Sequence, residues 1–79
     1  MTFPLVLVRW HDAWFDNDPP ATGYHTTFPV QTVGWLIHQD EQRTSVASEV
    51  LPHDEGFRAI THIPESSIID ITDLVPRPP

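Results

Sequence analysis

Histidine and carboxylate side chains are the groups in this sequence that could bind a metal ion. The chain has five histidines and eleven aspartate or glutamate residues. His11-Asp12 and His53-Asp54 could each offer one nitrogen and one oxygen ligand. However, no two histidines have the spacing that puts them on one face of a helix, and no cysteine is present to complete a zinc site. The spacing therefore predicts no metal site and no cofactor.

A pair of adjacent serines is the other candidate for chemistry. Ser66 and Ser67 lie near His62 and Glu65 in the sequence, a combination that could suggest a hydrolase. A serine nucleophile needs a base within hydrogen-bond reach and a third group that orients the base. Because the pair follows Pro64, its position is more typical of a capped turn that enters a strand. We therefore expect no catalytic residue, and a protein that is not an enzyme.

Aromatic and acidic side chains gather in one irregular stretch, residues 11–28. A loop of this length is unusual in a small domain and is typically functional or disordered. Aromatic side chains among polar ones are typical of binding hot spots. For these aromatic residues structural interpretations stay open beside binding: Trp10 as part of the core, and Trp14 and Phe15 either as exposed side chains or as a lid that folds back over one end of the domain. The predicted partner-binding residues are Trp10, Asp12, Trp14, Phe15, Asp16, Asp18 and Tyr24.

The net charge of −7 results from eleven acids against four arginines, with no lysine. Binding to a phosphate backbone requires several cationic contacts, so nucleic acid is not the expected partner. An acidic surface keeps a protein soluble or attracts a partner with a basic face. An acidic inhibitor that mimics nucleic acid at a host DNA-binding or defence protein is therefore an alternative function.

The rest of the sequence predicts short β-strands. Alternating apolar and β-branched residues mark them, and no segment of useful length has a helical period. Val33, Trp35 and Ile37 share one face of the clearest strand, where Gly34 predicts a bulge or a bend. One turn of 3₁₀ helix is expected over residues 64–67. The predicted strands are residues 3–10, 30–38, 44–51, 57–63 and 68–73.

This order of elements predicts an all-β fold, a five-stranded SH3-like (Sm-like) barrel. A long loop separates the first two strands, and the 3₁₀ turn precedes the last strand, which we expect to pair beside the first. The 79 residues allow one domain, residues 1–75, and a deep pocket inside it is not expected. Residues 76–79 read Pro-Arg-Pro-Pro, an extended tail that either frays or docks into an aromatic groove.

The N-terminal segment and the lack of cysteine bear on where the protein acts. Residues 1–9 have no basic region before their apolar run, and that run is too short for a signal peptide or a membrane span. A small domain without disulfides is more common in a reducing compartment. We therefore expect a cytoplasmic protein that does not contact a membrane.

Four segments together carry a resemblance to a known group of proteins. Residues 9–13 read Arg-Trp-His-Asp-Ala, residues 32–36 read Thr-Val-Gly-Trp-Leu, residues 46–49 read Val-Ala-Ser-Glu and residues 63–68 read Ile-Pro-Glu-Ser-Ser-Ile. In this order they resemble short proteins encoded by bacteriophages and prophages, most of them of unknown function. The resemblance implies a mobile-element origin, the cytoplasm of a host cell, and a host or phage protein as partner. The strand order is also similar to that of eukaryotic-type SH3 domains, as a likeness of fold alone.

These observations favour a binding protein over an enzyme. We expect a non-enzymatic phage or prophage accessory protein that docks on its partner through residues 11–28 and modulates a host protein. A small structural subunit that forms homo-oligomers through its edge strands is a further alternative.

Overall fold

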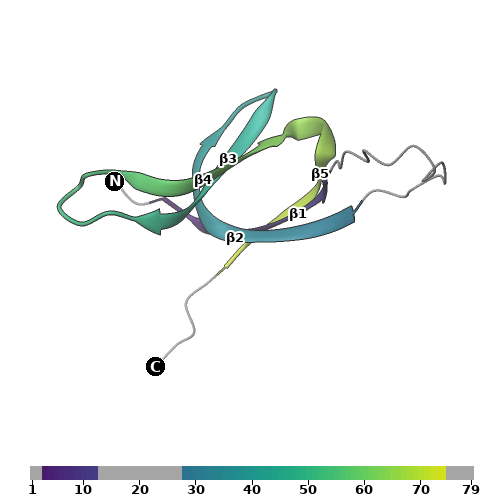
Figure 1. Ribbon diagram of the computed structural model, residues 1–79. Coiled ribbons are helices and arrows are strands. Elements are labelled where there is room, and N and C mark those ends of the chain that lie inside the picture. Colours follow the sequence, from purple (N-terminus) through teal and green to yellow (C-terminus); the bar gives the residue numbers. More distant parts are fainter. Residues whose placement is uncertain (1–2, 13–27, 75–79) are drawn as a thin grey trace, which may run out of the picture.

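The strands predicted from the sequence are present in the computed structural model, which describes residues 3–12 and 28–74 (Figure 1). Regular structure in these residues is β-strand apart from one turn of 3₁₀ helix, so the all-β prediction is confirmed. The elements are β1 (Leu5–Asp12), β2 (Phe28–Gln39), β3 (Arg43–Val50), β4 (Phe57–Pro64), η1 (Glu65–Ser67) and β5 (Ile68–Asp73).

The five strands form one antiparallel sheet in the order β4-β3-β2-β1-β5. Strand β5 pairs with β1, for example Ile71 with Val8, so the prediction that the last strand lies beside the first is confirmed. Strands β4 and β5 are the two edges of the sheet. Figure 1 shows that the sheet is strongly curved, with β2 bending around its interior.

The curvature brings apolar side chains from all five strands into one core. Val6 and Val8 of β1 are fully buried in the same cluster as Val46 of β3 and Ile63 of β4. Because β2 and β3 lie between β1 and β4 in the sheet, these side chains can share a core only if the sheet curls. Burial of apolar surface from water is the main stabilising effect here. The partly buried side chains that pack against the cluster are Trp10, Leu36, Ile68 and Ile71.

Gly34 lies where the backbone of β3 comes very close to that of β2. A Cβ atom at this position would be 2.4 Å from the carbonyl oxygen of Ala47 and 2.6 Å from Cγ1 of Val46. The register of this strand pair shifts further along, between Leu36 and His38. The glycine is therefore required for a close approach of two strands, and the bulge lies beyond it, at Ile37.

Strand β1 ends two residues later than the sequence predicted, and strand β2 begins two residues earlier. His11 pairs with Pro29, and Asp12 pairs with Phe28. Pro29 is tolerated in the strand because β3 pairs with β2 only from Trp35 to Gln39, so the outer side of β2 near Pro29 has no partner strand that would need its N–H. The interruption between the strands is therefore residues 13–27, which lie outside the described residues.

The 3₁₀ turn predicted before the last strand is η1. Its N-cap residue is Pro64, and no side chain caps its first turn. The N–H of Ile68 donates to the carbonyl oxygen of Glu65 and closes the turn. A backbone bond thus closes the C-terminal end of the turn, and its N-terminal end lacks a side-chain cap because proline carries no side-chain acceptor.

Candidate functional site

The turn between β3 and β4 contains unusual backbone. His53 and Asp54 have φ angles of 58° and 57°, and Glu55 donates its N–H to the carbonyl oxygen of Pro52 over 3.2 Å. Positive φ at both central residues is typical of a type I′ turn. Ala59 on β4 also has a φ of 57°, and no other non-glycine residue in the described ranges has a positive φ. The type I′ turn accounts for the positive φ of His53 and Asp54, whereas that of Ala59, on a strand, is unfavourable for alanine.

An open pocket lies against this turn. Its volume is about 450 Å³, within the size range of natural ligand sites. Phe3, just before β1, packs edge to face on Phe57, the first residue of β4, with ring centroids 5.1 Å apart and an interplanar angle of 88°. Trp35 of β2 is the third aromatic side chain. The full lining is Phe3, Trp35, Val50, Leu51, Asp54, Gly56 and Phe57.

The pocket faces solvent and lies apart from the buried core. Val50 is 52% exposed, Asp54 is exposed, and the three aromatic side chains are half-buried. None of the lining residues belongs to the core cluster or packs against it. Half-exposed aromatic surface is the kind that partners bury in protein interfaces.

Asp54 gives the edge of this pocket a negative charge that no cation in the described residues neutralises. Two arginines are paired with acids elsewhere on the sheet. Nε of Arg9 lies 2.9 Å from Oδ1 of Asp70, and Nη2 of Arg58 lies 3.0 Å from Oε2 of Glu49. These hydrogen bonds lower the pKa values of the Asp70 and Glu49 carboxyl groups. The pocket therefore carries an unbalanced negative charge, whereas arginines balance the charges of Glu49 on β3 and Asp70 on β5.

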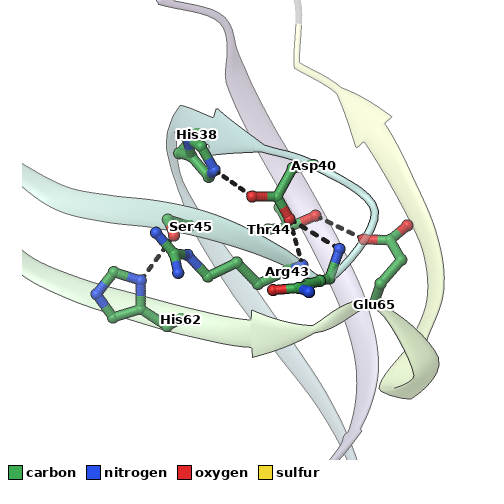
Figure 2. A network of polar contacts seen from close by, with 8 residues as sticks. His38, Asp40, Arg43, Thr44, Ser45, His62 and Glu65 are labelled. Carbon is green, nitrogen blue, oxygen red and sulfur yellow. Dashed lines mark hydrogen bonds and ion pairs between the residues drawn. The ribbon is translucent and has the colours of Figure 1, made fainter.

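The opposite end of β3 carries a network of polar contacts, which Figure 2 shows. In the turn between β2 and β3, Asp40 accepts hydrogen bonds from the N–H groups of Gln42 at 2.8 Å and Arg43 at 2.9 Å. Its second oxygen lies 2.7 Å from Nε2 of His38. The hydrogen bond with His38, and then the two backbone N–H groups, hold the pKa of Asp40 well below its usual range. Asp40 therefore serves to hold this turn together.

The same network contains a serine–histidine contact that looks like part of a catalytic site. Oγ of Ser45 lies 2.6 Å from Nδ1 of His62, and the Thr44 hydroxyl donates to Oε2 of Glu65 over 3.1 Å (Figure 2). Ser45 is only 1% exposed, so its hydroxyl cannot reach a substrate. Among residues 3–12 and 28–74, no carboxylate orients His62. The contact therefore satisfies a buried hydroxyl and stabilises the sheet.

The residues predicted to bind a partner fall into two groups. Trp10 packs against the core, and its Nε1–H donates to Oγ1 of Thr32 over 3.0 Å, an arrangement consistent with the core alternative. Asp12 is the last residue of β1, opposite Phe28. Their part in binding a partner stays a prediction. So does that of the remaining residues, which lie outside the described ranges: Trp14, Phe15, Asp16, Asp18 and Tyr24.

The sequence did not predict the aromatic pocket. Phe3 and Phe57 are far apart in the chain, and no sequence pattern indicates that they meet. Trp35 carried a partial signal, because it shares one face of the clearest predicted strand with Val33 and Ile37. Val33, which shares the Trp35 face, is 51% exposed, whereas Gly34 on the other face is buried. The outward face is therefore the more apolar one, and the alternation pattern alone could not distinguish the two.

Metal-binding clusters and membrane-spanning helices are not found in the described part of the chain. No group of three or more histidine, aspartate or glutamate side chains there could hold a metal ion. Its only helical structure, η1, is too short to cross a membrane. Comparisons with protein families, with curated proteins and with solved structures give no match to this chain. The resemblance to short phage proteins therefore stays a prediction.

Proposed function

We propose that this protein is a non-enzymatic protein-binding module that contacts its partner through the aromatic pocket at the β3–β4 turn. The observation that carries the proposal is the set of three half-exposed aromatic side chains, Phe3, Trp35 and Phe57, around an open pocket of about 450 Å³. Packing in the core cluster does not account for their position. Aromatic side chains contribute strongly to binding when a partner buries them.

Residues 11–28 enter the proposal as a separate region of contact. They begin where β1 ends, whereas Phe3 precedes the first residue of β1. At roughly 3.3 Å per residue along a strand, the two regions start about 25–30 Å apart. A partner can therefore use one without the other, and variants can test the two independently. If the resemblance to phage proteins holds, the partner is a host or phage protein.

The distribution of acids does not favour the nucleic-acid mimic. A mimic of a phosphate backbone needs its carboxylates in a row along one face. The acids of the described residues are instead spread over both hairpin turns, β1, β3, η1 and β5. Two of them, Glu49 and Asp70, are neutralised by arginines. The nucleic-acid mimic therefore gains no support from this distribution.

Neither edge strand favours assembly through strand pairing. Strand β4 contains Ala59 with a positive φ and ends at Pro64, and both features disturb a regular edge. Strand β5 carries the exposed Asp73, and a charged side chain on an edge strand opposes pairing with a further strand. These are features that natural sheets use to prevent edge pairing, so the structural-subunit alternative gains no support.

A peptide selection with matched variants tests the proposal. A displayed library of random peptides is selected on the full chain, and the affinity of each selected peptide is measured for the chain and for two variants. Val50→Lys places a positive charge in the pocket, and Val33→Lys places the same charge outside it, at valines that are 52% and 51% exposed. We expect peptides that lose about tenfold in affinity with Val50→Lys, equivalent to about 1.4 kcal/mol.

The same peptides should bind Val33→Lys and the unchanged chain with similar affinity. Dispersed amide NMR spectra of both variants serve to show that the sheet is intact. A selection that returns only peptides indifferent to Val50→Lys would refute the pocket as the contact.

A further inference from the structure

We propose that the pocket at the β3–β4 turn binds a cationic side chain, an arginine presented by a segment of the partner protein. The inference rests on the proposed function and names the group that the partner inserts. Two features of the pocket carry it: the unpaired carboxylate of Asp54 and the aromatic rings of Phe3, Trp35 and Phe57.

Asp54 determines the charge that the pocket prefers. It occupies the second central position of the turn, next to Glu55, and neither acid is paired with an arginine in the part of the chain that the structure describes. An apolar occupant would take water away from the Asp54 carboxylate without offering it a hydrogen bond, which is unfavourable. A guanidinium supplies that hydrogen bond, and can do so in a bidentate manner. The net charge of −7 adds long-range attraction for a basic segment.

The aromatic side chains suit the same occupant. Cations bind over the faces of aromatic rings, and arginine does so more often than lysine because its flat guanidinium stacks on a ring. Since Phe3 and Phe57 pack at 88°, the ring that presents its edge keeps both of its own faces free of the other ring. Val50 and Leu51 provide apolar surface for the methylene groups of an arginine side chain.

A pair of small probes tests this inference directly. The full chain is titrated with N-acetyl-arginine methylamide and, separately, with the neutral isostere N-acetyl-citrulline methylamide, while NMR follows the indole N–H of Trp35. We expect the arginine probe to shift this signal saturably, with an affinity on the order of millimolar, and the citrulline probe to bind more weakly.

Three variants of the chain sharpen the titration. Asp54→Asn should weaken the arginine probe by about two- to fivefold and reduce its salt dependence, as expected for an exposed ion pair. Phe57→Leu keeps an apolar side chain but removes a ring, and a similar loss is expected. Glu41→Gln changes an exposed acid of the β2–β3 turn, at the other end of β3, and should leave the affinity unchanged.

The outcomes separate this inference from the proposed function. Equal binding of the two probes, or undiminished binding to Asp54→Asn, overturns the inference. If selected peptides depend on Val50 but need no basic residue, the inference fails and the proposed function stands. If no selected peptide depends on Val50, the proposed function itself fails. If Arg77→Gln in the full chain strengthens binding of the arginine probe, the occupant is the chain's own C-terminal segment, and the assignment to a partner is wrong.

Discussion

The two ends of β3 differ in how many of their polar side chains find hydrogen-bond partners within the chain. At the Arg43 end, Asp40, Thr44 and Ser45 all have hydrogen-bond partners within the chain. At the Val50 end, three aromatic side chains are half-exposed, and Asp54 has no partner among the described residues. The non-glycine residues with positive φ in the described ranges also lie on this side, in the β3–β4 turn and on β4. Figure 1 shows the two turns at opposite ends of the strand.

The difference between the two ends indicates which side chains stabilise the fold and which are available to a binding partner. The Arg43 end holds a histidine–aspartate and a serine–histidine contact, both of which resemble catalytic pairs. Both contacts join two groups of the chain itself, and the serine of the serine–histidine contact is buried, as expected for groups that stabilise a fold. The Val50 end holds the Arg58–Glu49 ion pair, but three half-buried rings there line an open pocket, and Asp54 has no partner in the described residues. The end with less apparent chemistry is therefore the better candidate for binding.

Gly34→Ala should have the largest effect, because it disturbs the sheet that holds both ends of β3 in place. The added Cβ would meet the carbonyl oxygen of Ala47, which can move only if the strand moves. We expect a loss of about 1–3 kcal/mol in the free energy of unfolding, measured with urea. Ser48→Ala is the control, since it changes one small side chain at an exposed position of β3. A loss no larger than that of the control would contradict the close approach.

Two nearly isosteric substitutions of opposite kind, Thr44→Val and Val50→Thr, compare how much each end of β3 contributes to stability. Thr44→Val removes the hydrogen bond from a fully buried hydroxyl to Glu65, and should cost about 1 kcal/mol of unfolding free energy. Val50→Thr changes a half-exposed residue with no such bond, and its effect should stay within about 0.5 kcal/mol. Urea midpoints measure both. Equal losses would show that the two ends are equally involved in stability.

The pH dependence of stability sharpens the description of the Arg43 end. The folded chain lowers the pKa of Asp40 below its unfolded value of about 3.9, so the folded state binds fewer protons there. Its contribution is therefore fully present above that pH and is lost as the pH falls through the folded value. Asp40→Asn should lower the melting temperature at neutral pH, and the difference from the unchanged chain should shrink below about pH 4.

Circular dichroism melts from neutral pH down to about pH 2 measure this difference. Glu41→Gln is the control, because its carboxylate has no hydrogen bond among the residues that the structure describes, so the substitution removes no contact of this turn. A penalty for Asp40→Asn that stays constant over the whole range would contradict the role assigned to its carboxylate.

Ala59→Gly is expected to have the smallest effect and to act at the Val50 end. Its φ of 57° is unfavourable for alanine and free of strain for glycine. The relief should exceed the greater freedom of glycine in the unfolded chain, so we expect a net gain of about 0.5 kcal/mol. Ala47→Gly, at a buried strand position without positive φ, should destabilise the chain instead. Effects of the same sign in the two variants would remove the evidence for strain at this end.

The sequence predicted the fold better than the site, for physical reasons. Alternation of apolar residues and turn-forming residues indicated each strand and η1, because those signals are local. Gly34 predicted a bulge or a bend in β2, but only the position of Ala47 shows that the glycine permits a close approach of β3. The pocket depends on Phe3 meeting Phe57 across the curled sheet, and no local pattern encodes that contact. Where both faces of a strand are apolar, the pattern cannot say which one is buried.

Intermolecular nuclear Overhauser effects between a selected peptide and the full chain locate the partner on the sheet. We expect cross-peaks from the peptide to the rings of Phe3, Trp35 and Phe57, at the Val50 end of β3. Cross-peaks confined to His38 and the β2–β3 turn, or to residues 13–27, would contradict the proposed function, because they would place the partner away from the pocket.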